Sequence, residues 1–210
     1  MSVRGRLVAR FAALGLGLSI AIVPSFVAAE GRPQLVRVRG TVEKLDGQML
    51  TVKSRDGSPV AVALADNYAV STVVKADLAD IKPGDYIATA ALAQPDGMLR
   101  AQMVQIFPEA LRGIAEGHFP WDLTPDSTMT NATVANVVSK VDNRTLTLKY
   151  KGGEKTVVVP LTAPVVTLKP GSKDQLTPGS HVFIVAAKQA DGSLKAGRVS
   201  VGENGMVPPN

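Results

Sequence analysis

The chain has 210 residues, of which 45% are hydrophobic, 4% are aromatic and none is cysteine, so neither disulfide bonds nor thiolate ligands are available to it. Its formal net charge of +5 falls to +2 without the first 29 residues, because these hold three Arg and no acid and leave 20 Lys and Arg against 18 Asp and Glu. A balance this even, with so few aromatic side chains, argues against a nucleic-acid partner, whose binding needs a clustered basic face.

The first 29 residues have the three parts of a secretory signal peptide. Arginines among the first ten residues form a positive start, an apolar stretch follows over residues 11–26, and small residues precede Glu30. We expect cleavage before Glu30, export to the periplasm and no stable membrane span afterwards. The alternative is a retained anchor helix, but the apolar stretch is short against the roughly 20 residues of a membrane span, and Pro24 interrupts its end.

From residue 34 the hydrophobic pattern changes to an alternation of period two, which predicts strands with one buried face. In residues 35–45 small and apolar side chains alternate with charged and polar ones, and Asp46-Gly47 marks a hairpin turn. Only residues 75–81 have helical spacing. The further strands predicted in this half are 49–53, 59–65, 86–93 and 99–106.

The same order of strands and turns recurs later in the chain. Gly84 and Gly179 are 95 residues apart, as are Gly97 and Gly192 (179 − 84 = 192 − 97 = 95). A spacing this long indicates a duplicated domain rather than a solenoid repeat. The strands predicted in the second copy include 133–141, 145–150, 155–160 and 194–201.

Five short strands with a helical piece between the third and fourth are typical of an OB-type barrel. We therefore predict an all-β protein of two tandem five-stranded OB-like barrels, over residues 34–106 and 131–202, each with its own core. A small open sandwich is the alternative for each copy. Residues 203–210 have no period and are expected to be poorly ordered. The inward side chains predicted are Val38, Val42, Leu50, Val52 and Ile87 in the first copy, and Val134, Leu146, Leu148 and Phe183 in the second.

The connector, residues 107–130, holds the only Trp and one of the two His. Residues 108–116 predict a short helix with Pro in its first turn, and a Pro-rich loop follows. In the structural interpretation, which we favour, Trp121 covers the open end of a barrel as a clasp. In the alternative, the connector is a soft-metal site, because imidazole and thioether ligands select Cu(I) and an aromatic ring can rest against the cation.

The chain contains no recognisable catalytic motif: GxSxG, SxxK, HExxH, Walker and Rossmann patterns are all absent from the sequence. His118 and His181 are the only imidazoles, and no nucleophile–base pair is evident. His181 aligns with Tyr86 of the first copy and is expected at a barrel rim. We predict a non-enzymatic binding or assembly module of the cell envelope, without a cofactor and with a protein partner.

Two resemblances support these expectations. The repeat GTVEKLDGQMLTV…IKPGDYIATAALAQPDGMLRAQMVQI resembles a family of small exported β-barrel domains of unknown function found in proteobacteria, which implies fold and compartment. More distantly, each copy is similar to the periplasmic copper chaperones of the CusF type, five-stranded OB barrels that bind Cu(I) through His, two Met and Trp. This second resemblance implies a copper site of His118, Trp121 and Met129, with Met98 or Met103 as the other thioether.

Overall fold

The computed structural model describes residues 34–139 and 143–210. In this part of the chain the protein is all-β, and no helix there is longer than three residues. The signal peptide predicted over residues 1–29 lies outside the described residues. In the described part, no helix combines the length and apolar character that crossing a membrane requires.

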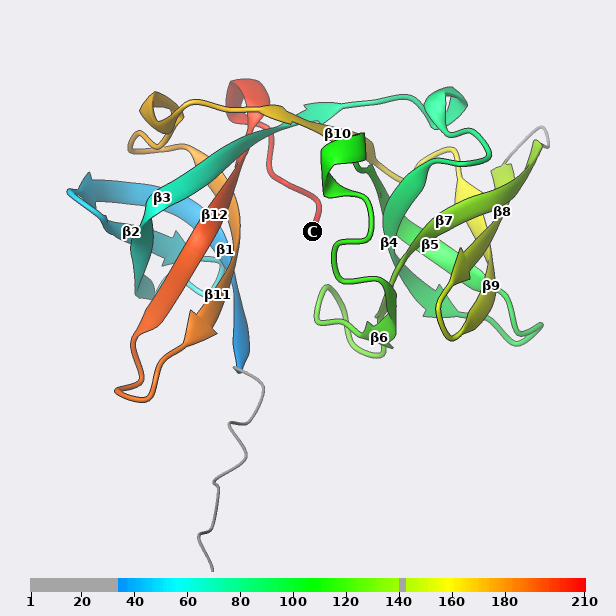
Figure 1. Ribbon diagram of the computed structural model, residues 1–210, viewed down its shortest axis with the longest axis horizontal. Helices are drawn as coiled ribbons and strands as arrows, with labels where there is room; N and C mark the ends of the chain where they lie inside the picture. Colours follow the sequence, from blue (N-terminus) through cyan, green and yellow to red (C-terminus); the bar gives the residue numbers. More distant parts are fainter. Residues whose placement is uncertain (1–33, 140–142) are drawn as a thin grey trace, which may run out of the picture. The chain divides into compact units, whose positions relative to one another are not determined.

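Twelve strands are formed in the described residues, and four short 3-10 turns lie between or after them (Figure 1). The turns are η1 (Leu78–Asp80), η2 (Glu109–Leu111), η3 (Lys173–Gln175) and η4 (Glu203–Gly205). The strands are β1 (Leu35–Asp46), β2 (Met49–Ser54), β3 (Pro59–Lys75), β4 (Tyr86–Ala93), β5 (Leu99–Ile106), β6 (Gly117–Pro120), β7 (Thr128–Ser139), β8 (Asn143–Tyr150), β9 (Gly153–Pro160), β10 (Val165–Pro170), β11 (His181–Lys188) and β12 (Leu194–Gly202).

Five of these strands close into a barrel, the first ring. Around it the order is β1, β2, β3, β12 and β11, with β11 pairing back onto β1. The β3–β12 pair is parallel and the others are antiparallel. Alternate side chains point inward and form one apolar core, in which Leu50 and Val52 are fully buried. Closure leaves this ring without a free edge, unlike the open sandwich considered as an alternative.

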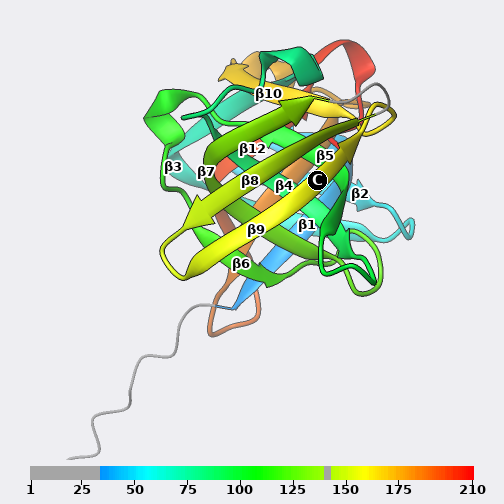
Figure 2. The same cartoon turned by 90° about the vertical axis from the view of Figure 1, so that its right-hand side faces the viewer.

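A second circuit of five strands, the second ring, has the same order and directions. Here β7, β8 and β9 lie side by side (Figure 2), β5 pairs with β9 and β4, and β4 pairs back onto β7. The closing β5–β9 pair is parallel and short, joining Leu99 and Arg100 to Val157 and Val158. The short strand β6 pairs with β7. A separate apolar core fills this ring, centred on Leu146 and Leu148.

Each ring takes strands from both copies of the repeat, so the prediction that each copy folds as its own barrel is wrong. The first copy gives β1–β3 to the first ring and β4 and β5 to the second, and the second copy does the reverse. The chain passes between the rings along β3 and β10, which pair antiparallel with Val73 opposite Leu168. These two residues are themselves 95 apart (168 − 73 = 95), so equivalent residues of the two copies meet at the crossing.

The exchange has a local cause in β3. We predicted that this strand ends at residue 65, but it continues to Lys75, and its last part is rich in β-branched side chains. Val70, Val73 and Val74 are buried there, so continuing the strand covers them. The helical piece predicted at 75–81 shrinks to the 3-10 turn Leu78–Asp80, and β4 therefore starts beside β7 rather than beside β1.

The predicted core residues are buried with one exception. Phe183 is half-buried, because the β11 register turns its neighbours Val182 and Ile184 into the core. Ile87 is fully buried, but it belongs to the core of the second ring. The side chains confirmed as inward are Val38, Val42, Leu50, Val52, Ile87, Val134, Leu146 and Leu148.

Two segments outside the rings also differ from the predictions. The helix expected at residues 108–116 is reduced to Glu109–Leu111, because Gly113 and Ala115 have φ values of 83° and 47°, which no helix continues through. The C-terminal residues, expected to be poorly ordered, pack against the strands. There Asn210 is buried, and its side-chain amide donates to Gln105 Oε1 at 2.9 Å.

Candidate functional site

The structure places His118 and Met129 on opposite faces of the β6–β7 pair. His118 lies opposite Thr130, and the two side chains are hydrogen-bonded at 2.8 Å between Nδ1 and Oγ1. Phe119 lies opposite Met129. Because consecutive strand residues point to opposite faces, the His118 imidazole and the Met129 thioether do not converge on one ion. Burial, and after it the charge of Lys155, lowers the pKa of His118 below its ordinary value of 6.5, so the ring is neutral at pH 7.

Met103 and Met129 do come together, in an apolar cluster between the strands. Both are almost fully buried, and Trp121 packs against the same cluster. Met98 lies elsewhere, beside Arg100 at a different cavity. Within residues 34–139 and 143–210, no group of three His, Asp or Glu side chains is placed to hold a metal ion. The two thioethers and the indole are arranged as packing, with the imidazole on the other side of the strand pair.

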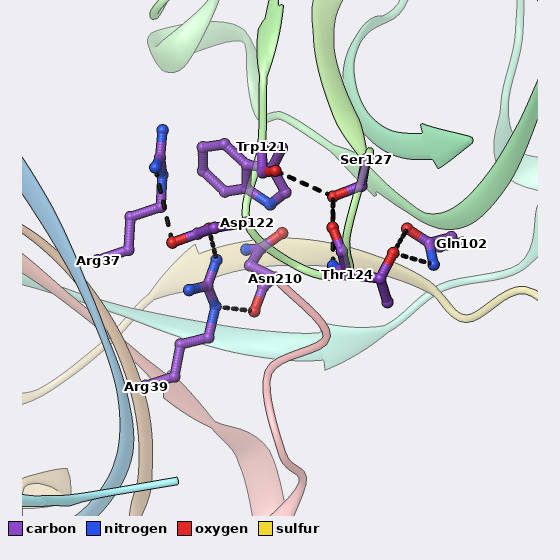
Figure 3. A network of polar contacts seen from close by, with 8 residues as sticks. All are labelled: Arg37, Arg39, Gln102, Trp121, Asp122, Thr124, Ser127 and Asn210. Atoms are coloured by element: carbon purple, nitrogen blue, oxygen red, sulfur yellow. Dashed lines mark hydrogen bonds and ion pairs between the residues drawn. The ribbon is translucent and has the colours of Figure 1, made fainter. Parts of the chain in front are cut away.

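Trp121 joins the connector to the first ring. Its indole is half-buried, and the Arg37 guanidinium lies 4.0 Å from the ring centroid (Figure 3). The ring centroid of Phe183 lies 6.3 Å from that of Trp121. The connector folds back on itself there, because the main-chain N–H of Trp121 donates to the main-chain carbonyl of Ser127 at 2.8 Å. The same side chain also packs against the cluster around Met129, so Trp121 lies between this cluster and the first ring, and the covering of a barrel end stays a prediction.

Asp122, the connector residue after Trp121, forms ion pairs with two arginines of β1. Asp122 Oδ1 accepts from Arg39 at 2.7 Å, and Arg37 lies 3.6 Å from Asp122 Oδ2 (Figure 3). Burial alone would raise the pKa of Asp122, but the Arg39 hydrogen bond and the charges of both arginines outweigh it, and the pKa is lowered. Arg39 also donates through Nε to the main-chain oxygen of Asn210 at 2.7 Å. The connector and the C-terminal segment therefore meet at one arginine of β1.

Beside Arg39 the first ring has a cavity of about 440 Å³, the basic pocket. Strands β1, β2 and β11 form its walls, and Val207 and Pro208 of the C-terminal segment form part of its rim. No Asp or Glu lines it among the residues that the structure describes. Its cationic and hydrogen-bonding side chains are Arg39, Thr41, Lys53, Ser54, Arg55 and His181.

Positive charges are crowded in this pocket. Partial burial, and after it the charge of Arg39, lower the pKa of Arg55, and the charge of Asp122 offsets this only in part. In the described part of the chain, neither Lys53 nor Arg55 forms an ion pair. The nearby Asp56 carboxylate accepts instead from Ser54 Oγ, at 2.6 Å. An anion bound here would relieve repulsion that the chain itself leaves uncompensated.

Local backbone geometry positions the pocket walls. A Cβ on Gly40 would lie 2.0 Å from the carbonyl oxygen of Lys53, so only Gly allows β1 and β2 to approach this closely. The imidazole of His181 is held by Thr41, whose Oγ1 lies 3.2 Å from Nδ1. Sequence reasoning placed His181 at a rim but missed the pocket. The available signal was the spacing of Lys53 and Arg55, two residues apart on the same side of the chain.

A second cavity of about 450 Å³ lies on the second ring and has a mixed lining. One acid, Asp96, and one base, Arg100, line it, so no single charge dominates. No protein-family model, curated protein or solved structure matches the chain. The resemblances to exported β-barrel domains and to copper chaperones therefore stay predictions, and the basic pocket is the strongest candidate site.

Proposed function

We propose that the protein is an exported, non-enzymatic binding module of the cell envelope that holds an anionic ligand in the basic pocket. One observation carries this proposal. Three cationic side chains and an imidazole converge on a cavity of about 440 Å³ that, among the described residues, no carboxylate lines. Charge-assisted hydrogen bonds to a carboxylate or phosphate are about twice as strong as neutral ones, so an anion is the ligand class that this lining favours.

The position of the pocket supports the same proposal. We interpret both rings as OB-like barrels whose fourth and fifth strands are exchanged between the copies. OB barrels bind ligands on the face of strands 2 and 3 and at neighbouring loops. In the first ring, Lys53 comes from the second strand and Arg55 from the turn that follows it. The basic pocket thus shares strand 2 with that ligand-binding face, and its other lining residues come from strands 1 and 4 of the ring, the turn after strand 2 and the C-terminal segment.

Binding is favoured over catalysis because the pocket lacks an activated nucleophile. Its nearest approach to a nucleophile–base pair is the hydrogen bond between Thr41 and His181. Within the described residues, no carboxylate is hydrogen-bonded to the His181 ring to orient it as a base. The contacts of the predicted copper ligands do not favour a metal-binding function either, since His118 and Met129 face apart.

The anion-binding proposal can be tested on the mature chain with inorganic tripolyphosphate as a compact probe. We expect the probe to raise the melting temperature saturably, and the shift to shrink with salt. The double variant Lys53→Gln/Arg55→Gln should lose the shift. A matched control, Lys188→Gln/Lys195→Gln, removes the same charge from exposed positions of the same ring and should keep it. Equal shifts in both variants would show that only net charge attracts the probe, and would overturn the proposal.

A further inference from the structure

The second ring has a position equivalent to the basic pocket, and the strand registers identify it. Thr41 pairs with His181 on one side and Lys53 on the other, as Thr133 pairs with Tyr86 and Lys149. Counting along the same strands relates further residues of the two rings. The resulting pairs, first ring first, are Arg39 and Asn131, Thr41 and Thr133, Lys53 and Lys149, Arg55 and Lys151, and His181 and Tyr86.

In the second ring this position is filled by the chain itself. The carbonyl of Ile114 accepts from Tyr86 Oη at 3.0 Å and from Asn131 Nδ2 at 3.2 Å. The carboxylate of Glu116 accepts from the main-chain N–H of Lys151 at 2.9 Å. Burial, and after it the charge of Glu116, raises the pKa of Tyr86 to about 12. A short turn of the connector therefore occupies the position equivalent to the basic pocket, and it is held there through the carbonyl of Ile114 and the carboxylate of Glu116.

In the first ring the corresponding segment leaves room. Glu203–Gly205 follows β12 as Glu109–Leu111 follows β5, so the C-terminal segment is the counterpart of the connector. It reaches Arg39 through the main-chain oxygen of Asn210 and lines the pocket with Val207 and Pro208. A cavity of about 440 Å³ remains beside it. Among the described residues, no Asp or Glu lines this cavity, whereas Glu116 occupies the equivalent position in the second ring.

One of the donors also differs in charge. The neutral Asn131 has the guanidinium of Arg39 as its counterpart, and Tyr86 has the imidazole of His181. Arg39 already holds Asp122 and Asn210, so the cations left for a ligand are Lys53 and Arg55. Cationic donors that face solvent without an ion pair favour an incoming carboxylate over a neutral carbonyl alone.

We infer that the basic pocket binds a short acidic peptide segment of a partner protein, at the position where the second ring holds its own connector, with cationic side chains in place of the Lys151 main-chain N–H as donors to the carboxylate. A carboxylate lies against Lys53 and Arg55, and a main-chain carbonyl accepts from His181. The inference rests on the proposed anion-binding function and names its ligand class. Single-stranded nucleic acid is disfavoured, because such sites stack bases on aromatic rings and the pocket lining offers only an imidazole.

The experiment uses the capped peptide Gly-Ile-Ala-Glu-Gly, the sequence of residues 113–117, and the same peptide with Gln in place of Glu. Amide chemical shifts of the isotope-labelled mature chain report binding residue by residue. We expect saturable shifts around Lys53, Arg55 and His181, with the Glu peptide binding about tenfold more tightly than the Gln peptide. Arg55→Gln should weaken the Glu peptide by a similar factor, and Lys188→Gln should leave it unchanged.

Other outcomes separate this inference from the proposed function. If tripolyphosphate shifts the same amides and neither peptide does, the peptide ligand is wrong and anion binding stands. If no probe shifts them, both are wrong. Equal affinity for the two peptides would remove the role of the carboxylate and overturn the inference. Tighter binding of single-stranded oligothymidylate than of the Glu peptide would replace the peptide partner with nucleic acid.

Discussion

Replacing Leu50 with Ala tests whether strand exchange makes the two rings unfold together. Leu50 is fully buried in the core of the first ring and has no part in the second. A buried Leu→Ala substitution costs about 3–4 kcal/mol where the cavity does not collapse. For a urea m-value of about 2 kcal/mol per molar, the unfolding midpoint should fall by about 1.5–2 M.

Two signals should follow the unfolding. Trp121 emission reports the place where the connector meets the cluster around Met129 and the Arg37 and Phe183 side chains of the first ring. Far-ultraviolet circular dichroism reports all strands. Because β3 of the first ring pairs with β10, and β10 pairs with β5 of the second ring, both rings belong to one hydrogen-bonded sheet, and we expect them to unfold together. Both signals should therefore show one transition with the same lowered midpoint.

Leu161→Ala is the matched control, since this leucine is 63% exposed and its truncation should change stability by less than about 0.5 kcal/mol. Two separate transitions would refute the reasoning. The clearest contrary result is a Leu50→Ala variant in which circular dichroism shows a further transition at the wild-type midpoint, after the Trp121 transition is complete. That outcome would mean that the rings unfold independently, as tandem barrels would.

Four further predictions concern the pocket and the connector. Gly40→Ala should destabilise the protein by about 1–3 kcal/mol, because its Cβ would overlap the Lys53 carbonyl, and an unchanged melting temperature would show that the strands separate freely. Trp121→Ala should cost about 2–3 kcal/mol, less than a fully buried Trp. Cu(I) added without oxygen should leave wild-type Trp121 emission unchanged, whereas saturable one-to-one quenching would favour the copper hypothesis. The lowered pKa of Asp122 stabilises the folded state above about pH 4, and this contribution is lost as the pH falls through the folded-state value. Asp122→Asn should therefore flatten the acid side of the curve of unfolding free energy against pH, and parallel curves would contradict the ion pair.

The faces of the strands could be predicted from sequence because a period-two pattern records which side is buried. Val42 and Val52, predicted inward, lie opposite each other in the first ring, and Val134 and Leu148 do the same in the second. The one error, Phe183, comes from a strand that begins with five apolar or aromatic positions out of six, where alternation is weak. Burial follows from local pattern where the pattern is clear.

Strand partners could not be predicted in the same way. The two copies have similar hydrophobic patterns, so β4 could bury its apolar face by pairing with β1 or with β7. The local sequence does not distinguish these two partners. The deciding element is β3, whose buried valines at 70, 73 and 74 extend it past the expected turn. Because β3 continues to Lys75 and pairs there with β10, the chain leaves the first ring, and the next strand, β4, pairs with β7.

The candidate site depends on the same non-local information. His118 and Met129 looked like ligands in the sequence, but the pairing of β6 with β7 places them on opposite faces. The basic pocket could not be recognised, because Arg39 and Lys53 are brought together only by the β1–β2 register and His181 only by the β1–β11 register. Reasoning from sequence motifs therefore favoured residues of a single segment, the connector. It missed the basic pocket, whose walls come from three strands, β1, β2 and β11.

Strand exchange gives ligand binding in the first ring a consequence for the whole fold. A ligand that binds only the folded protein stabilises it by RT ln(1 + [L]/Kd), about 2.7 kcal/mol at a hundredfold excess over Kd. In tandem barrels this gain would be confined to one barrel. Here β3 of the first ring is joined through β10 to β5 of the second, so a peptide bound against Lys53 and Arg55 should raise the unfolding midpoint reported by Trp121 as much as the one reported by circular dichroism. In the second ring the equivalent position is already occupied by Ile114 and Glu116, so the stabilisation by an added peptide should come from the first ring alone and reach the second through β10.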